Sequence, residues 1–222
     1  MNRLFTFLAC FFFFGQLQSQ EIDRDLLAIK SRLDSIDHYE ASISLDVLAS
    51  FIKMPTKYAT ITYDKDQPVS FTSDNFILIP KRGLDFTLTQ LFQYPFITLD
   101  RGIEKRQDNS YKVINVIPDD DHAEYTIAKI LLDTTNLRIV ESEINTRNEG
   151  SFRLQLFYNG SQSALPDRVE ITFELQKLRL PFNFFGKDTQ IDRQELRSLE
   201  EKKGTIILRL TDYVISTTAI KK

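Results

Sequence analysis

The stretch YEASISLDVLASF, residues 39–51, has apolar side chains at its odd positions and polar ones at the even positions up to Asp46. Successive side chains of a β-strand point to opposite faces, so residues two apart share a face. The stretch therefore predicts a long strand with one buried face and one face in water. From Leu48 to Ile52 both faces are apolar, and Met54-Pro55 ends the strand.

The same alternation returns in the second half of the chain. Phe152, Leu154 and Leu156 share one face of the stretch SFRLQLFY (151–158), and Val169, Ile171, Phe173 and Leu175 share one face of RVEITFEL (168–175). Further strands are expected over residues 57–63, 69–73, 76–79, 96–101, 111–117, 123–132, 137–146, 168–180 and 205–215. Strands joined by short turns are typical of an antiparallel meander.

One irregularity predicts how this sheet bends. The alternation slips by one residue at Gln176-Lys177, which indicates a β-bulge, and a bulge increases the local twist of a sheet. A large coiled sheet with one apolar concave face is a half-barrel. Water on that face would be unfavourable, so other parts of the chain must cover it.

Three segments depart from the strand pattern and are suited to cover the concave face. Residues 21–36 place Leu26, Leu33 and other apolar residues at helical spacing, and residues 84–94 do the same before Pro95 stops the helix. Residues 192–202 are polar and helix-forming. We therefore expect one mainly β (α+β) domain over residues 21–222. It is an unclosed antiparallel half-barrel wrapped around the N-terminal helix and short lid helices.

The N-terminus has the pattern of a secretory signal peptide. Arg3 precedes an apolar run of about eleven residues, whereas a transmembrane helix needs about 20. We expect residues 1–20 to be removed and the mature protein to be periplasmic. An outer-membrane lipoprotein attached through Cys10 is the less favoured alternative, because four phenylalanines follow Cys10 where a polar tether should begin.

The remaining composition favours binding over catalysis. The formal net charge of −3 does not predict a nucleic-acid partner. Motifs for a serine nucleophile, a phosphate loop or a zinc hydrolase are missing from the sequence, and we expect no enzyme activity and no cofactor. His38 and His122 are expected in solvated turns. The acidic turn at residues 119–121 is too short to wrap around a cation, so we expect no metal site.

Two short basic pairs, Lys81-Arg82 and Lys105-Arg106, leave two interpretations open. They can serve as ordinary solvated charges, which is the favoured interpretation, or they can contact a phosphate or an anionic lipid headgroup.

The order of motifs over residues 112–186 resembles the LolA/LolB-like superfamily of outer-membrane lipoprotein carriers and sorting proteins. The matching segments are Ile117-Pro118-Asp119, Leu131-Leu132-Asp133, the strand 139–145, Gly150-Ser151-Phe152-Arg153-Leu154, Phe157-Tyr158-Asn159, Phe173 and Leu180-Pro181. The blocks IPKRGLDF (79–86) and YPFITLDRG (94–102) look like a Bacteroidetes-type variant of that group.

The resemblance implies an unclosed antiparallel barrel around a helical lid, with a cavity that shelters the acyl chains of a lipoprotein. One family feature is missing. The proteobacterial Pro-x-x-Phe-Arg-Trp run, whose arginine latches the lid, is here Pro68-Val69-Ser70-Phe71-Thr72, so the latch is not carried over.

These observations lead to a specific hypothesis, a non-catalytic periplasmic carrier of acylated cargo that serves outer-membrane lipoprotein sorting and contacts a membrane transiently. Its cavity would be lined by Ile43, Leu45, Val47, Leu154, Leu156, Ile171 and Phe173. Its lid would be formed by Leu84, Phe86, Leu88, Leu91 and Phe92.

Alternatives remain open for both the residues and the function. The same apolar residues can form an ordinary filled core. In that case the protein would be an envelope protein-interaction module whose working surface is the strand edges and the charged convex face, Arg153, Arg168, Glu170 and Glu174. A hydrolase is the least favoured class.

Overall fold

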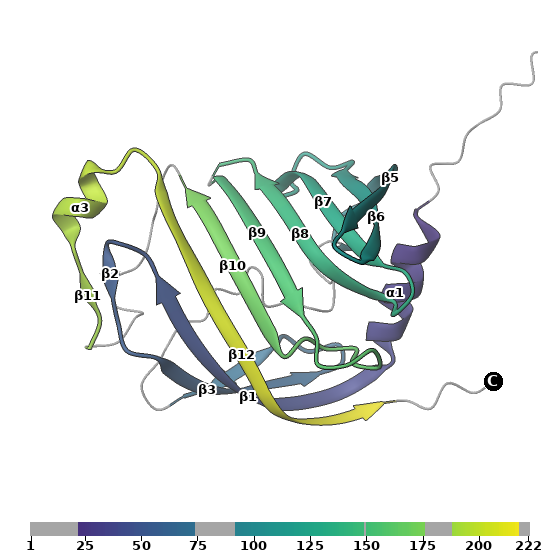
Figure 1. Ribbon diagram of the computed structural model, residues 1–222, viewed down its shortest axis with the longest axis horizontal. Coiled ribbons are helices and arrows are strands. Elements are labelled where there is room, and N and C mark those ends of the chain that lie inside the picture. The colour runs from purple at the N-terminus through teal and green to yellow at the C-terminus, as the bar shows by residue number, and fades with distance from the viewer. Residues whose placement is uncertain (1–21, 74–91, 149, 176–187, 218–222) are drawn as a thin grey trace, which may run out of the picture.

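The computed structural model describes residues 22–73, 92–148, 150–175 and 188–217 (Figure 1). The described elements are, in chain order, α1 (Arg24–Asp34), β1 (Ile36–Leu48), β2 (Ile52–Lys53), β3 (Lys57–Asp64), β4 (Ser70–Thr72), β5 (Phe96–Arg106), β6 (Asn109–Pro118), β7 (Tyr125–Asp133), β8 (Arg138–Thr146), β9 (Gly150–Phe157), β10 (Arg168–Leu175), β11 (Gln190–Ile191), α3 (Arg193–Ser198) and β12 (Lys202–Thr217). The predicted strand 76–79 lies outside the described residues.

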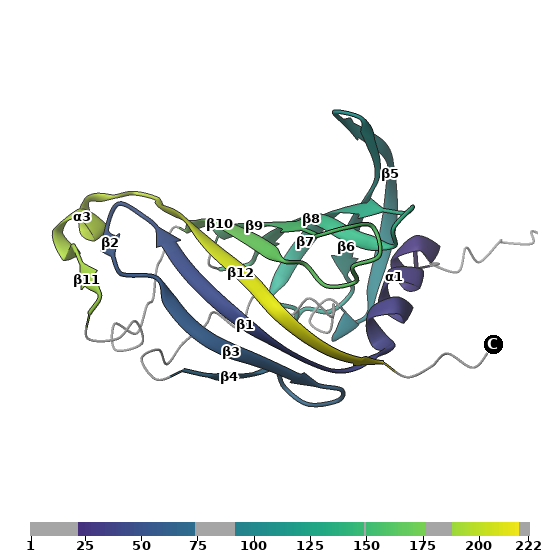
Figure 2. The ribbon, with the colours of Figure 1, turned by 60° about the horizontal axis from the view of Figure 1, so that its bottom comes forward.

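Ten of these strands form one sheet in the order β4-β3-β1-β12-β10-β9-β8-β7-β6-β5. The pairs with a described register are antiparallel, and the last strand, β12, lies between β1 and β10. Figure 2 shows the sheet curling strongly while β4 and β5 stay apart at its two edges. The predicted open antiparallel half-barrel is confirmed.

The bends of the sheet come from irregularities that the sequence analysis did not find. The register between β1 and β12 shifts between Glu40 and Ser42, and Asp212 on β12 adopts a positive φ there. On β5 the register shifts after Asp100, where Gly102 has φ 86°. Each shift places an extra residue in one strand, which increases its twist. The bulge predicted at residues 176–177 lies outside the described residues.

The first strand ends earlier than predicted. β1 ends at Leu48, and a bridge between Ala49 and Ile52 then turns the chain into the short strand β2. The apolar end of the predicted strand belongs to this turn: Phe51 and Ile52 are buried with Phe173 in a small second cluster.

Helix α1 packs across one end of the sheet. The Asp23 side chain accepts hydrogen bonds from the backbone N–H groups of Asp25 and Leu26, which begins the helix, and Leu26, Ile29 and Leu33 are buried in the main core. The Asp23 N–H donates to Thr98 Oγ1 of β5 at 2.8 Å. The predicted helix 21–36 is therefore confirmed with shorter bounds.

Lys112 of β6 ties α1 to the sheet. Its Nζ lies 2.6 Å from the Asp23 carboxylate and 2.7 Å from that of Asp25. Burial by itself would lower the pKa of Lys112. The hydrogen bonds to the two carboxylates have a larger, opposite effect, so the net shift of this pKa is upward. At the other end of α1, Arg32 donates to the backbone carbonyls of Leu137 and Gln162.

Helix α3 lies at the opposite end of the molecule from α1 (Figures 1 and 2). It begins at Asp192, whose side chain caps the N–H groups of Gln194 and Glu195. Leu196 and Leu199 pack against the second cluster around Phe173. The segment 192–202, predicted as a cover, thus contributes a helix that covers this end cluster.

Candidate functional site

The inner face of the half-barrel is the candidate site. One row of directly opposed residues crosses seven neighbouring strands in the order Val47, Ile206, Ile171, Leu154, Ser142, Ile130 and Ile114. Directly opposed residues of antiparallel strands share a face of the sheet. Strands far apart in sequence therefore contribute to a continuous and largely apolar surface.

The seven residues predicted to line a cavity all lie on this face, at different depths. Ile43, Leu45, Leu154 and Ile171 are buried in the main core. Val47 and Leu156 are half-buried and pack against that core, while Phe173 is buried in the second cluster. The structure thus places apolar side chains of β1, β9 and β10 on one face and divides them between two clusters.

Three further inner-face side chains, Ile144, Phe152 and Ile206, are half-buried and pack against the same core. Phe152 lies directly opposite Ile144 on one side and Phe173 on the other. Together with Val47 and Leu156 they form an incompletely covered apolar group on the inner face. The alternation in residues 151–158 placed Phe152 on this face, but the sequence did not show which side chains keep exposed area.

Among the predicted lid residues, Phe92 is the one that the structure describes. Its ring packs edge-on against Phe96 of β5, with centroids 5.0 Å apart, and Lys30 of α1 lies over the ring. Phe92 therefore joins α1 to the edge of the sheet. Leu84, Phe86, Leu88 and Leu91 lie outside the described residues.

A charged side chain interrupts the apolar inner face. Lys57 begins β3 directly opposite Leu45, and its side chain is 4% exposed. Its Nζ donates to the carboxylate of Asp188, just before β11, and this hydrogen bond holds the pKa of Asp188 below its usual value. Sequence reasoning missed this pair. The available signal was the spacing of two residues that places Lys57 on the same face of the strand as Ala59 and Ile61.

The outer face carries paired charges. Arg153 pairs with Glu143, and Arg168 pairs with Glu170 and stacks over the Phe157 ring. Arg153, Arg168 and Glu170 are residues of the charged convex face that the interaction-module hypothesis would use. Exposed ion pairs of this kind contribute little to stability.

In the basic pair Lys105-Arg106, the Arg106 side chain is partly exposed and is also held in ion pairs. Its guanidinium binds both carboxylate oxygens of Glu141 on β8, and Glu141 is 5% exposed. Arg106 also donates to Glu104. Three of the five guanidinium N–H donors of Arg106 are therefore used within the protein. Lys81 and Arg82 lie outside the described residues.

Both histidines keep exposed area. His38 Nδ1 lies 2.7 Å from Asp64, at the rim of β1 and β3. The turn near His122 is closed by Asp120, which accepts a hydrogen bond from the His122 N–H, and this bond holds the pKa of Asp120 low. In the described part of the chain, no group of three or more His, Cys, Asp and Glu side chains is arranged to bind a metal.

No helix within the described ranges is long and apolar enough to cross a bilayer.

Comparison with known proteins gives structural relatives only. The sequence matches no protein-family profile and no curated protein. The structure resembles a domain assigned to outer membrane lipoprotein sorting from Vibrio parahaemolyticus, with a TM-score of 0.54 and 11% identity, covering 88% of this chain and 92% of that one. It also resembles a DUF1329 family protein from Desulfovibrio piger, with a TM-score of 0.53 and 8% identity, covering 86% of this chain and 91% of the other.

A LolA superfamily protein from Nitrosomonas europaea aligns over 87% of this chain and 94% of its own, with a TM-score of 0.46 and 12% identity. At these identities the likeness concerns the fold. The open ten-stranded sheet and the first two alignments show that this chain shares the open half-barrel fold of those two proteins.

Proposed function

We propose that this protein is a non-catalytic periplasmic carrier that binds the acyl chains of lipid-modified cargo on the inner face of its half-barrel. The observation that carries the proposal is the incompletely covered apolar surface of Val47, Ile144, Phe152, Leu156 and Ile206 inside a curled, open sheet. Ligand sites are concave and mostly apolar, with few polar groups. The shared fold with a lipoprotein-sorting domain supports the same function.

The acyl-binding function is tested by lipid retention and by one pair of variants. Native mass spectrometry of protein purified from the periplasm without detergent is expected to show bound lipid. Phe152→Gln is expected to lower the affinity for a fluorescent fatty acid at least about tenfold, because it removes apolar contact area worth roughly 1.5 kcal/mol or more. Arg153→Gln, the adjacent outer-face change, should leave the affinity unchanged.

Two results would reject the carrier. One is a protein that neither retains lipid nor binds the fatty acid, which would mean a filled core. The other is equal loss of affinity in Phe152→Gln and Arg153→Gln, which would mean that the ligand does not lie on the inner face.

Export is the second part of the proposal. Residues 1–20 are expected to be absent from the mature protein, so N-terminal sequencing of exported protein should begin at or near Glu21. If the exported chain instead starts at a lipidated Cys10, the protein is anchored to a membrane, and the proposal of a freely diffusing periplasmic carrier is wrong.

A second candidate function, an envelope protein-interaction module, is favoured by the edge strand β5. Among the described strands it ends the sheet, and Leu99 and Ile103 on it are 47% and 64% exposed. Such an edge can pair with a strand of another protein. Copurification of a stoichiometric protein partner without bound lipid would favour this function over the carrier.

A further inference from the structure

Lys57 is the one buried cation among the described residues. It is placed on the inner face by the register of β3, because Lys57 lies opposite Leu45, and Ala59 opposite Ile43. A lysine at such a position is unfavourable in an apolar interior unless its charge is compensated. Its presence therefore calls for an anionic partner on the inner face.

That partner is supplied from the surface. Across the described residues, the polar contact of Lys57 Nζ is with the carboxylate of Asp188, whose side chain is 53% exposed. An ammonium group has three donors, so one carboxylate contact leaves capacity for further acceptors. The other buried charges are held differently: Glu141 is bound by Arg106 and Gln155, and Asp133 by Asn136 and Arg138.

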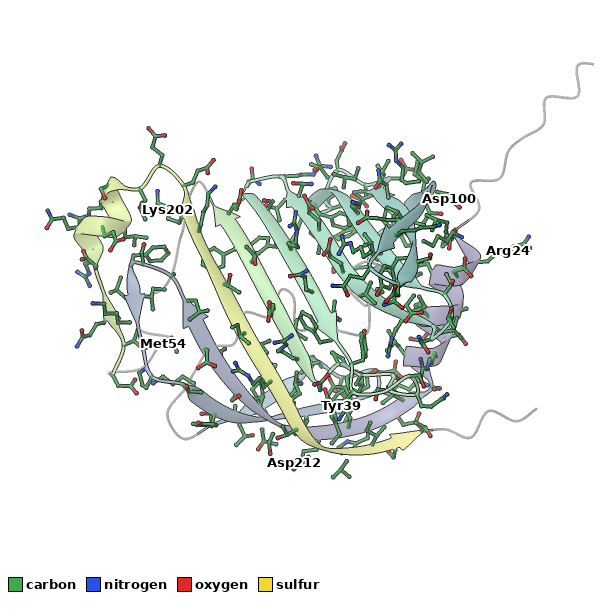
Figure 3. The ribbon with its side chains drawn as sticks, in the orientation of Figure 1. Arg24, Tyr39, Met54, Asp100, Lys202 and Asp212 are labelled. Carbon is green, nitrogen blue, oxygen red and sulfur yellow. The ribbon has the colours of Figure 1, made fainter. Side chains whose placement is uncertain are left out.

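The cation also lies next to the incompletely covered apolar surface. Lys57 shares its cross-strand row with Leu45 and Leu208, and the next row on the same face begins with Val47 and Ile206. Rows on one face are two residues apart, or about 7 Å along a strand. Figure 3 labels Met54, which lies three residues before Lys57 in the chain and marks the region near β2 where Lys57 is found. One cation beside an apolar surface is a combination that suits an amphiphile with an acidic head.

We propose that Lys57 binds the anionic head, a carboxylate or a phosphate, of an amphiphile whose acyl chain lies on the inner face. This inference rests on the proposed acyl-binding function and specifies its ligand class. Asp188 presents to Lys57 the same chemical group as a fatty acid, so the ligand's head takes the place of the Asp188 carboxylate. The partly exposed Asp188 side chain can then turn to water.

The test uses three ligands with one chain length and different heads: dodecanoate, dodecyl phosphate and the neutral dodecanol. Calorimetric titration of the mature protein is expected to give about tenfold tighter binding of at least one anionic ligand than of dodecanol, as a charge-assisted hydrogen bond implies. Whichever of dodecanoate and dodecyl phosphate binds more tightly identifies the preferred head group, a carboxylate or a phosphate. Lys57→Met should abolish the preference and leave dodecanol binding unchanged.

Two further variants keep the result interpretable. Lys203→Met, an exposed outer-face lysine paired with Glu174, should keep the wild-type preference. Asp188→Asn removes the internal competitor and should tighten anionic binding several-fold without changing dodecanol binding, and this result does not depend on the folding of Lys57→Met. Equal binding of all three ligands to wild type, or an unchanged preference in Lys57→Met, would overturn the role of Lys57 while leaving acyl binding intact. Failure of all three ligands to bind would reject the acyl-binding function itself.

Discussion

Replacing Leu45 with arginine is expected to lower the free energy of unfolding by about 3 kcal/mol or more, a large part of the roughly 5–15 kcal/mol that holds a typical domain together. Leu45 is 3% exposed and lies between Leu208 and Lys57 on the inner face. The new guanidinium would be buried in an apolar row beside an existing cation, with no added anion. Urea unfolding measures the loss.

The neighbouring residue provides the control. Asp46 lies on the outer face, where it accepts a hydrogen bond from Thr56 and pairs with Arg209. The bond from Thr56 and the pairing with Arg209 outweigh burial and lower the pKa of Asp46. Asp46→Asn should therefore cost about 0.2–1 kcal/mol. Similar losses at Leu45 and Asp46 would show that β1 is not one-sided and would contradict the inner-face assignment.

The contrast between these two residues shows what a sequence pattern can predict. The period of two assigns Leu45 and Asp46 to opposite faces because strand geometry is local. The same argument placed Ile43, Leu154 and Ile171 correctly on one surface. It could not show that Asp46 has partners, because Arg209 is brought beside it by the pairing of the first and last strands. From the sequence alone, Asp46→Asn would be expected to have almost no effect.

Two ion pairs that sequence reasoning missed are long-range. Lys57 meets Asp188 across 131 positions of the chain, and Arg106 meets Glu141 across 35. Neither pair leaves a periodic signal, since each depends on how the sheet curls and where its bulges fall. Phe173 was placed on the correct face but packs with Phe51, because the chain turns at Ala49.

Replacing Arg106 with methionine is expected to be strongly destabilising, although Arg106 lies on the outer face. Its Nη1 and Nη2 donate to the two carboxylate oxygens of Glu141 at 2.8 and 3.0 Å. The variant leaves the buried Glu141 with one described donor, Gln155. Removing one partner of a buried pair costs about 3–5 kcal/mol, and since Arg106 itself is partly exposed we expect about 2–3 kcal/mol at pH 7.

The pH dependence identifies the cause. The hydrogen bonds from Arg106 outweigh burial and hold the pKa of Glu141 below its usual value of 4.5. In the wild type this pairing stabilises the protein fully above about pH 4.5, and the stabilisation is lost as the pH falls through the lowered pKa. In Arg106→Met, burial instead raises the pKa of Glu141, so the carboxylate takes up a proton as the medium becomes acidic. The difference between variant and wild type should therefore be large at pH 7 and shrink at pH 4.

Two controls separate the buried pair from a general surface effect. Lys203→Met removes the exposed partner of Glu174 and should cost less than about 1 kcal/mol with little dependence on pH. Adding Glu141→Leu to Arg106→Met should recover part of the lost stability, because no buried charge then remains unpaired. A double variant as unstable as Arg106→Met would contradict this explanation. The loss would then arise from the missing packing of the Arg106 side chain on the outer face, and the ion pair between β5 and β8 would not be its cause.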